Sequence, residues 1–163
     1  MDKFLKALQL FRDNIDNKDE ETMLQVCKEI ILFIADESNN LLVLVDKEGY
    51  PLIIEIEDGA MLLTYTSYSE ANKVHKNNED VDYMLDTALH IFDRISKINS
   101  YSGLAINDGT SPLMYIPRDI LAVLVACANQ LKTKKQYVTG ANIISSITWD
   151  YELQNQAIVC SYY

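Results

Sequence analysis

Few residues of this chain could perform covalent catalysis. A Ser or Cys nucleophile needs a neighbouring base, usually His, and the 163 residues hold only His75 and His90. His75 falls late in a short polar segment and is expected at the surface. His90 lies beside a longer apolar stripe and is expected at its margin. Ser102-Gly103 lacks the first glycine of a nucleophile elbow. The sequence therefore predicts no catalytic residues and a protein that is not an enzyme.

Cofactor and metal motifs are also missing from the sequence. Phosphate-binding loops need clustered glycines, so that backbone N–H groups can reach the phosphate. The five glycines are isolated from one another. The acidic clusters at 13–21 and 79–82 lack the glycine that a calcium loop requires, and the three cysteines show no C-x-x-C spacing. We therefore expect no cofactor and no metal.

Charge and hydropathy narrow the classes of partner. The chain has 14 basic and 24 acidic residues, a net charge of −10, which phosphate backbones and anionic membranes repel. The longest apolar run, Ile120 to Ala128, is nine residues, about half of a ~20-residue membrane span. The first residues lack the apolar stretch of a signal peptide, and an odd cysteine count does not indicate a disulfide framework. We expect a cytoplasmic protein that binds neither nucleic acid nor membrane.

Tyrosine is the one unusual component of the composition. Ten tyrosines outnumber the four phenylalanines and the single tryptophan together. Trp149, Tyr151, Tyr162 and Tyr163 share the C-terminal segment, and such side chains are enriched at interface hot spots. One interpretation is that Trp149 and its face complete the core. The other hypothesis is that these four residues form a partner-binding surface.

The elements that would position these residues begin with a helical hairpin over residues 1–38. Apolar residues recur at steps of three and four over 2–15 and again over 19–35, which predicts two helices, each with one apolar face. Asp2 is the expected N-cap of the first helix. Acidic residues from Asp19 onward complement the dipole of the second helix.

The next segment changes to the two-residue period of strands. Residues 41–45 are continuously apolar, as expected for a strand buried on both faces. Strands at 52–57 and 60–66 follow, joined by the Asp58-Gly59 turn. The prediction is an antiparallel meander of three consecutive strands.

Two helices are expected after this meander. Ser67 and Glu70 have the spacing of a capping box, which predicts a short helix that ends near Lys76. Residues 80–98 carry apolar side chains at helical spacing and are predicted to form one long helix capped by Asp80.

The last part of the body combines two short strands, at 103–106 and 112–116, with a helix over 117–131. Pro117 suits the first position of that helix, and its nearly continuous apolar sequence predicts burial on all sides. Alternating residues then predict a terminal β element over 137–163.

Together these elements predict one domain of the α+β class over residues 1–163. A mainly antiparallel sheet would pack against helices. The helical hairpin (1–38) would precede a body (41–131), and the terminal β element (137–163) would follow it.

Five segments of the body occur in an order and spacing that match a known family. They are Leu41–Val45, the Asp58-Gly59 turn, LTYTSYSEA at 63–71, GLAIN at 103–107 and YIPRDIL at 115–121. The chain resembles the N-terminal domain of the SseB family, named for enhanced serine sensitivity, over about residues 41–124. Tyr65 stands where the family usually has Phe, and Asp108 where an Asn-Pro pair is common. The resemblance implies an α+β bacterial intracellular domain and transfers no catalytic residue.

Three functional hypotheses follow from these observations. The first is a non-catalytic protein-interaction or regulatory module whose partner is another protein. The alternative is an immunity protein that neutralises a toxin, since a basic toxin would be steered electrostatically onto an acidic surface. The third is a small-molecule enzyme with a pocket between the meander and the helix at 117–131. A pocket that pairs His90 with an Asp or Cys would favour this hypothesis.

Overall fold

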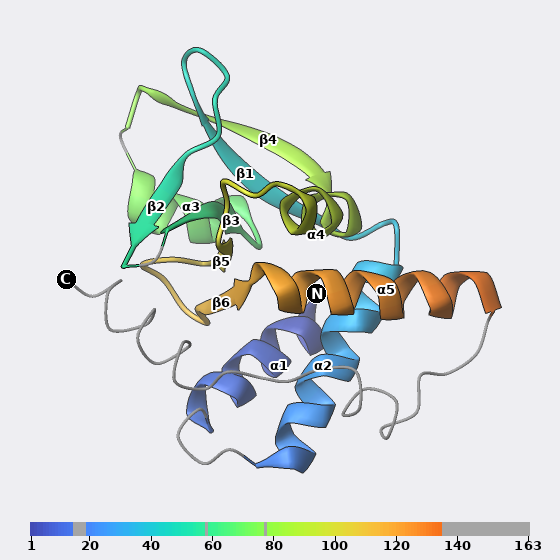
Figure 1. Cartoon of the computed structure of the whole chain (residues 1–163). Coiled ribbons are helices and arrows are strands. Elements are labelled where there is room, and N and C mark those ends of the chain that lie inside the picture. Colours follow the sequence, from blue (N-terminus) through green and yellow to red (C-terminus); the bar gives the residue numbers. More distant parts are fainter. Residues whose placement is uncertain (15–18, 58, 77, 135–163) are drawn as a thin grey trace.

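The computed structural model describes residues 1–14, 19–57, 59–76 and 78–134 (Figure 1). The predicted β element at 137–163, with Trp149, Tyr151, Tyr162 and Tyr163, lies outside these residues. The described part is α+β, as predicted. Its elements are α1 (Asp2–Asp13), α2 (Glu20–Ala35), β1 (Asn40–Asp46), β2 (Ile53–Ile56), β3 (Gly59–Tyr65), α3 (Tyr68–His75), β4 (Val81–Thr87), α4 (Ala88–Lys97), β5 (Gly103–Ile106), β6 (Met114–Pro117) and α5 (Arg118–Lys134).

The six strands form one mixed, mostly antiparallel sheet in the order β4-β1-β3-β5-β6, with β2 paired to β3. β3 and β5 are parallel, and every other pairing is antiparallel. The predicted meander is wrong, because β1 and β2 share one edge of β3 instead of pairing with each other. A single bridge between Val45 and Pro51 joins them. The bridge is flanked by two hydrogen bonds of 2.8 Å, from the Asp46 N–H to the Tyr50 carbonyl and from the Leu52 N–H to the Leu44 carbonyl.

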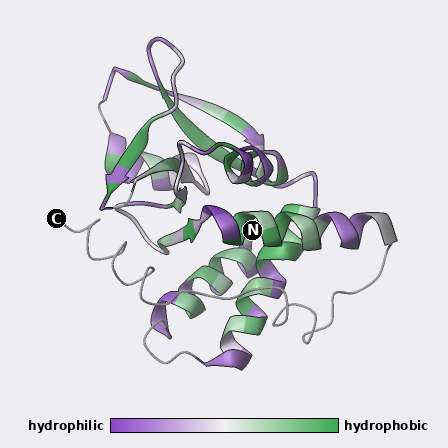
Figure 2. Cartoon of the chain, viewed as in Figure 1, coloured by the Kyte–Doolittle hydropathy of each residue, from purple (hydrophilic) through white to green (hydrophobic). Residues whose placement is uncertain are grey.

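Helices α1, α2, α4 and α5 cover one face of the sheet, and α3 packs on the other. The α1–α2 pair and α5 pack together below the sheet in Figure 1, and α4 contacts α5. Side chains from all four helices join those of β1, β3, β5 and β6 in the main core. Figure 2 shows hydrophobic residues along α2, α5 and β1. α5 is not buried on all sides as predicted: Ala122, Ala126 and Gln130 are exposed.

The opposite face of the sheet carries two smaller apolar clusters. One contains Met61, Leu63 and Tyr115, and the other contains Tyr65 with Ala71 of α3. Alternate residues of β3 therefore serve opposite layers, as the two-residue period of a strand requires.

The segment 80–98 differs most from the sequence prediction of one long helix. Residues Val81–Thr87 form β4, which pairs with β1 along its whole length. The helix α4 starts only at Ala88, with Thr87 as its N-cap. Asp80 does not cap a helix and instead forms an ion pair with Lys47.

Side-chain caps explain two of the other helix starts. Asp19 accepts a hydrogen bond from the Glu21 N–H at the start of α2, and Ser67 accepts one from the Glu70 N–H at the start of α3, as the capping-box spacing predicts. Two expectations are wrong. Met1, not Asp2, is the N-cap of α1, and Pro117 ends β6 rather than beginning α5.

Candidate functional site

The outer edge of β4 is an open edge of the sheet among the described residues (Figure 1). The Ala88 N–H donates to the Asn39 carbonyl over 2.9 Å, so these two residues form a hydrogen-bonded pair of the β1–β4 ladder. Hydrogen-bonded pairs alternate with unbonded pairs in an antiparallel ladder. The even-numbered residues of β4 therefore direct their backbone N–H and C=O groups toward β1. The odd-numbered residues direct theirs outward.

Two of the four outward N–H groups already have local acceptors. The Val81 N–H donates to the Asn78 carbonyl over 3.4 Å. The Thr87 N–H donates to the Asp86 carboxylate over 2.8 Å. Nothing within the described ranges accepts a hydrogen bond from the N–H of Tyr83 or Leu85. These two residues therefore leave the backbone groups of the β4 centre open to another strand.

The side chains at this centre are apolar and exposed on both faces of the sheet. Met84 is 46% exposed on the face covered by α4, and Leu85 is 55% exposed on the face covered by α3. Tyr83 is anchored: its ring meets Tyr68 edge-on at 5.0 Å, and its hydroxyl donates to Asn72 over 2.9 Å. The edge is thus held by α3 while its apolar side chains remain exposed.

A small cavity of about 80 Å³ lies beside Met84, between the sheet and α4. Its lining is mainly apolar and includes Ile91, Ile95 and Tyr101. The charged Arg94 side chain also lines it. The cavity would hold part of one apolar side chain, so it offers no room for a small-molecule substrate of ordinary size.

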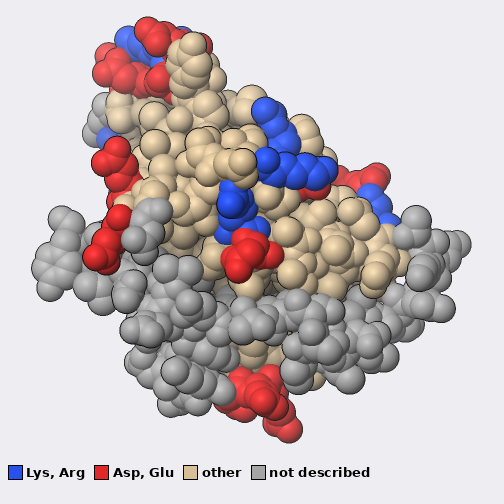
Figure 3. Space-filling view, in the orientation of Figure 1, with Lys and Arg blue, Asp and Glu red and all other residues tan. Residues whose placement is uncertain are grey.

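Acidic residues flank the open edge. Asp82 is exposed, and no ion pair or hydrogen bond holds its carboxylate within the described residues. Asp80 lies 3.0 Å from Lys47. Figure 3 shows acidic side chains, with basic ones among them, at the top of the view over the β1–β2 loop and the start of β4. The exposed carboxylate of Asp82 therefore favours a cationic group of a partner at this position of the edge.

His90 is paired with a carboxylate, which would favour the enzyme hypothesis, although the groove beside it is not lined by the strands of the predicted meander. Its Nδ1 lies 2.5 Å from Asp86 Oδ2, and a carboxylate in that place orients an imidazole as a base. The pair adjoins an open groove of about 500 Å³ lined in part by Glu37 and Thr87. The Thr87 hydroxyl accepts the His90 N–H as a helix cap, and no Ser or Cys lines this groove among the described residues. The arrangement supplies a base without an activated nucleophile.

His75 is not the simple surface residue that the sequence indicates. It is half-buried, and its Nε2 lies 3.1 Å from the Tyr65 hydroxyl. That hydroxyl donates to the Asp108 carbonyl over 2.8 Å, so it must accept from the imidazole, whose Nε2 then carries the proton. Burial lowers the pKa of His75. Burial also raises the pKa of Tyr65. The pair is a structural contact between α3 and β3.

The segments that carry the family resemblance meet around Asn107. This residue is fully buried and has a φ of 59°. Its Oδ1 accepts from the Thr66 N–H over 3.0 Å and from the Thr66 hydroxyl over 3.2 Å. Its Nδ2 donates to the Pro112 carbonyl over 3.0 Å. The Thr110 hydroxyl donates to Glu70 of α3. These contacts join the end of β3 to the β5–β6 loop, and their role is structural.

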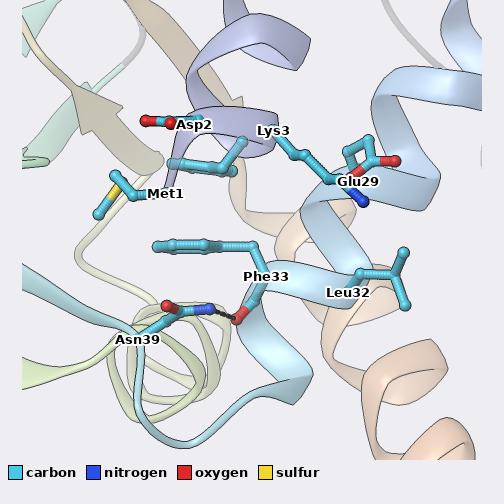
Figure 4. Close-up of a pocket in the computed structure, with 8 residues that line it drawn as sticks. Met1, Asp2, Lys3, Glu29, Leu32, Phe33 and Asn39 are labelled. Carbon is cyan, nitrogen blue, oxygen red and sulfur yellow. Dashed lines mark hydrogen bonds between the residues drawn. The ribbon is translucent and has the colours of Figure 1, made fainter.

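A second open groove, of about 570 Å³, lies between α1 and α2 (Figure 4). The rings of Phe4 and Phe33 stack within it at 3.9 Å, and both are buried. Asn39 donates to the Phe33 carbonyl over 2.9 Å, as the dashed line in Figure 4 shows. The stacked rings thus hold the helical hairpin together and leave little apolar surface for a ligand.

The other features that could indicate a function are metal ligands, membrane-spanning helices and free cysteines. No group of three potential metal ligands occurs in the described residues. No helix there is both long and apolar enough to span a bilayer. Cys27 and Cys127 are free, buried thiols, and burial raises the pKa of Cys27 to about 12. The four aromatic residues proposed for partner binding, like Cys160, lie beyond residue 134.

Comparison of the chain with protein-family models, with curated proteins and with solved structures finds no match. Within the described residues, the fold and its contacts define an α+β domain in which the outer edge of β4 is open and flanked by acidic residues.

Proposed function

We propose that this chain is a non-catalytic protein-interaction or regulatory module of the SseB N-terminal-domain type, acting in the bacterial cytoplasm. The observation that supports it best is the outer edge of β4, where the backbone groups of Tyr83 and Leu85 have no partner within the described residues. Met84 and Leu85 add exposed apolar surface on both faces there.

Open strand edges bind extended segments of other chains by adding a strand to the sheet. Main-chain hydrogen bonds supply affinity, and alternate side chains supply specificity. Natural proteins usually blunt or cover such edges, because an open edge promotes unwanted association. The carboxylates of Asp82 and Asp86 act against association of this edge with itself. Met84 and Leu85 nevertheless stay exposed there, and we explain this combination as a surface that binds another chain.

Leu85→Pro tests this proposal. The substitution removes the outward N–H and the exposed side chain, yet it leaves the ladder to β1 intact, because the Leu85 N–H does not face β1. Leu85→Val is the matched control, since it keeps the N–H and a strand-forming side chain. Both variants should retain the wild-type circular dichroism spectrum.

Affinity purification from the native host, followed by mass spectrometry, is the readout. We expect a protein partner that the wild-type chain and Leu85→Val recover equally and that Leu85→Pro loses. Recovery of the same proteins by all three chains, or of none, would refute a function of this edge in binding.

The alternative function is an immunity protein that neutralises a basic toxin. The specific observation in its favour is the acidic border of the β4 edge, where Asp82 has no cationic partner among the described residues. Co-expression with a toxin encoded beside its gene should protect cells, and Leu85→Pro should abolish protection.

The hypothesis that Trp149, Tyr151, Tyr162 and Tyr163 bind a partner does not depend on the β4 edge. Unchanged association by a chain that ends at Asn155 would count against it.

A further inference from the structure

We propose that the segment bound by the β4 edge is an extended antiparallel strand with a basic residue at each end of a five-residue core and an apolar residue at its centre. The inference rests on the proposed function, because it specifies the partner of the same edge. It follows from the register, the charges and the exposed side chains of β4.

The register follows from which backbone groups are open. An antiparallel strand that uses the N–H and C=O groups of both Tyr83 and Leu85 must place its own bonding residues opposite these two positions. Its central residue then lies opposite Met84. Its first and fifth residues lie opposite Asp86 and Asp82. The core thus has five positions, of which the second and fourth form the hydrogen bonds.

The charges decide what occupies the two ends of this core. Asp82 and Asp86 lie on one face of β4, and both fall at unbonded positions of the new ladder, where facing side chains approach most closely. Opposite charges stabilise such cross-strand pairs, and like charges destabilise them. Asp86 already contacts His90, so the residue opposite the free Asp82 contributes more.

The same register disfavours a second copy of this chain as the occupant. Pairing β4 with its symmetry-related equivalent through all four open groups puts Met84 opposite Met84. It also puts Asp82 of each copy opposite Asp86 of the other. Two carboxylate pairs would then face each other at the closest positions of the ladder. The acidic residues therefore act against self-pairing and favour a cationic strand.

The exposed side chains set the remaining positions. Met84 and the adjacent cavity lie on the α4 face, so an apolar central residue of the partner would pack there. Leu85 is exposed on the opposite face and favours a β-branched or aromatic residue at the second position. A core of Lys-Val-Val-Thr-Lys satisfies all five positions.

The test is fluorescence anisotropy with the full chain and a labelled, end-blocked peptide that contains Lys-Val-Val-Thr-Lys. A Glu-Val-Val-Thr-Glu peptide controls for charge. N-methylation of the second core residue removes a hydrogen bond to β4, whereas N-methylation of the third removes a group that points away. At 0.15 M salt we expect the basic peptide and its third-position methyl form to bind. The acidic and second-position methyl forms should bind at least tenfold more weakly.

Charge variants of the protein complete the test. Asp82→Asn should weaken binding about two- to fivefold, as expected for one exposed ion pair, and Asp82→Lys should reverse the preference toward the acidic peptide. Glu21→Gln removes the same charge from α2 and should leave binding unchanged.

Each of the following outcomes would overturn the inference. Equal binding of the basic and acidic peptides would do so, as would equal effects of the two N-methyl groups. Edge-dependent dimerisation of the chain alone, lost in Leu85→Pro, would identify a second copy as the occupant. If a host protein is captured through the edge but the basic peptide does not bind, the inference fails while the proposed function stands. If neither binds, both fail.

Discussion

Replacement of Asn107 tests how the end of β3 is held to the β5–β6 loop. Asn107→Ala removes the amide that pairs with the Thr66 N–H and the Pro112 carbonyl. A fully buried group left without a partner costs about 1–3 kcal/mol. The Thr66 N–H is buried and the Pro112 carbonyl only partly so, and the loss should therefore be about 2–4 kcal/mol. Ala also keeps a side chain at a φ of 59°, which costs a further 1–2 kcal/mol or so.

Asn107→Gly separates these two contributions. Gly loses the same hydrogen bonds but adopts a positive φ freely. Its greater freedom in the unfolded chain offsets about 0.4–1 kcal/mol of that advantage, so Asn107→Gly should be more stable than Asn107→Ala by about 1 kcal/mol. Asn40→Ala, at an exposed position of β1, is the control and should change stability by less than about 0.5 kcal/mol.

Urea unfolding followed by circular dichroism measures the differences in the free energy of unfolding, and thermal melts measure the differences in Tm. For a chain of this length, 1 kcal/mol shifts Tm by about 2–4 °C, so the Asn107→Gly variant should melt roughly 5–15 °C below the wild type. The reasoning is refuted if both variants unfold within about 0.5 kcal/mol of the wild type. The argument from φ is wrong if Asn107→Ala is the more stable of the two.

Two further predictions concern the same half of the molecule. Because folding lowers the pKa of His75, the unfolded state binds more protons, and the stability that His75 contributes above pH 6.5 should fall as the pH decreases below 6.5. His75→Gln still donates to Tyr65, and its free energy of unfolding should therefore depend less on pH between pH 7 and 5. The same pH profile for variant and wild type would contradict this. Gly103→Ala places a Cβ 2.2 Å from the Ile116 carbonyl oxygen and should lower the free energy of unfolding by on the order of 3 kcal/mol. In the control Gly49→Ala the new Cβ meets no atom within 4 Å, and the positive φ alone should cost about 1–2 kcal/mol. Equal melting temperatures of the two variants would contradict the steric argument.

The α+β class and the helical hairpin could be predicted from the sequence because local signals agree with the fold. Asp19 and Ser67 cap the helices that follow them, and the apolar steps of three and four in α1 and α2 mark their buried faces. In these elements the local preference and the tertiary packing point the same way.

The prediction fails at the β4–α4 junction for a physical reason. Val81, Met84 and Leu85 are spaced as on one helix face. In the edge strand β4, however, Met84 lies on one face of the sheet and Val81 and Leu85 lie on the other, and all three are at least partly exposed. Their spacing happens to continue in phase with the true helix from Ala88. The pairing of β4 with β1 connects residues about forty positions apart, and no local pattern carries that information. Thr87, a favourable N-cap, is the one signal that indicates the real start of α4.

The candidate site was missed by the same error. Residues assigned to a helix have no open backbone groups, so the edge at Tyr83 and Leu85 could not be inferred from the sequence. The parallel pairing of β3 with β5, which places β3 inside the sheet, also depends on contacts distant in sequence. The acidic bias was visible from composition, but its place beside an open edge was not.

The central claim is that the outer edge of β4 binds an extended segment of another protein. Amide hydrogen exchange, measured with and without the captured partner, tests it most directly. Binding should slow exchange at the N–H groups of Tyr83 and Leu85, whereas the N–H of Met84, already directed at β1, should change little. Protection elsewhere on the surface, with Tyr83 and Leu85 exchanging at the same rate in both states, would contradict the account.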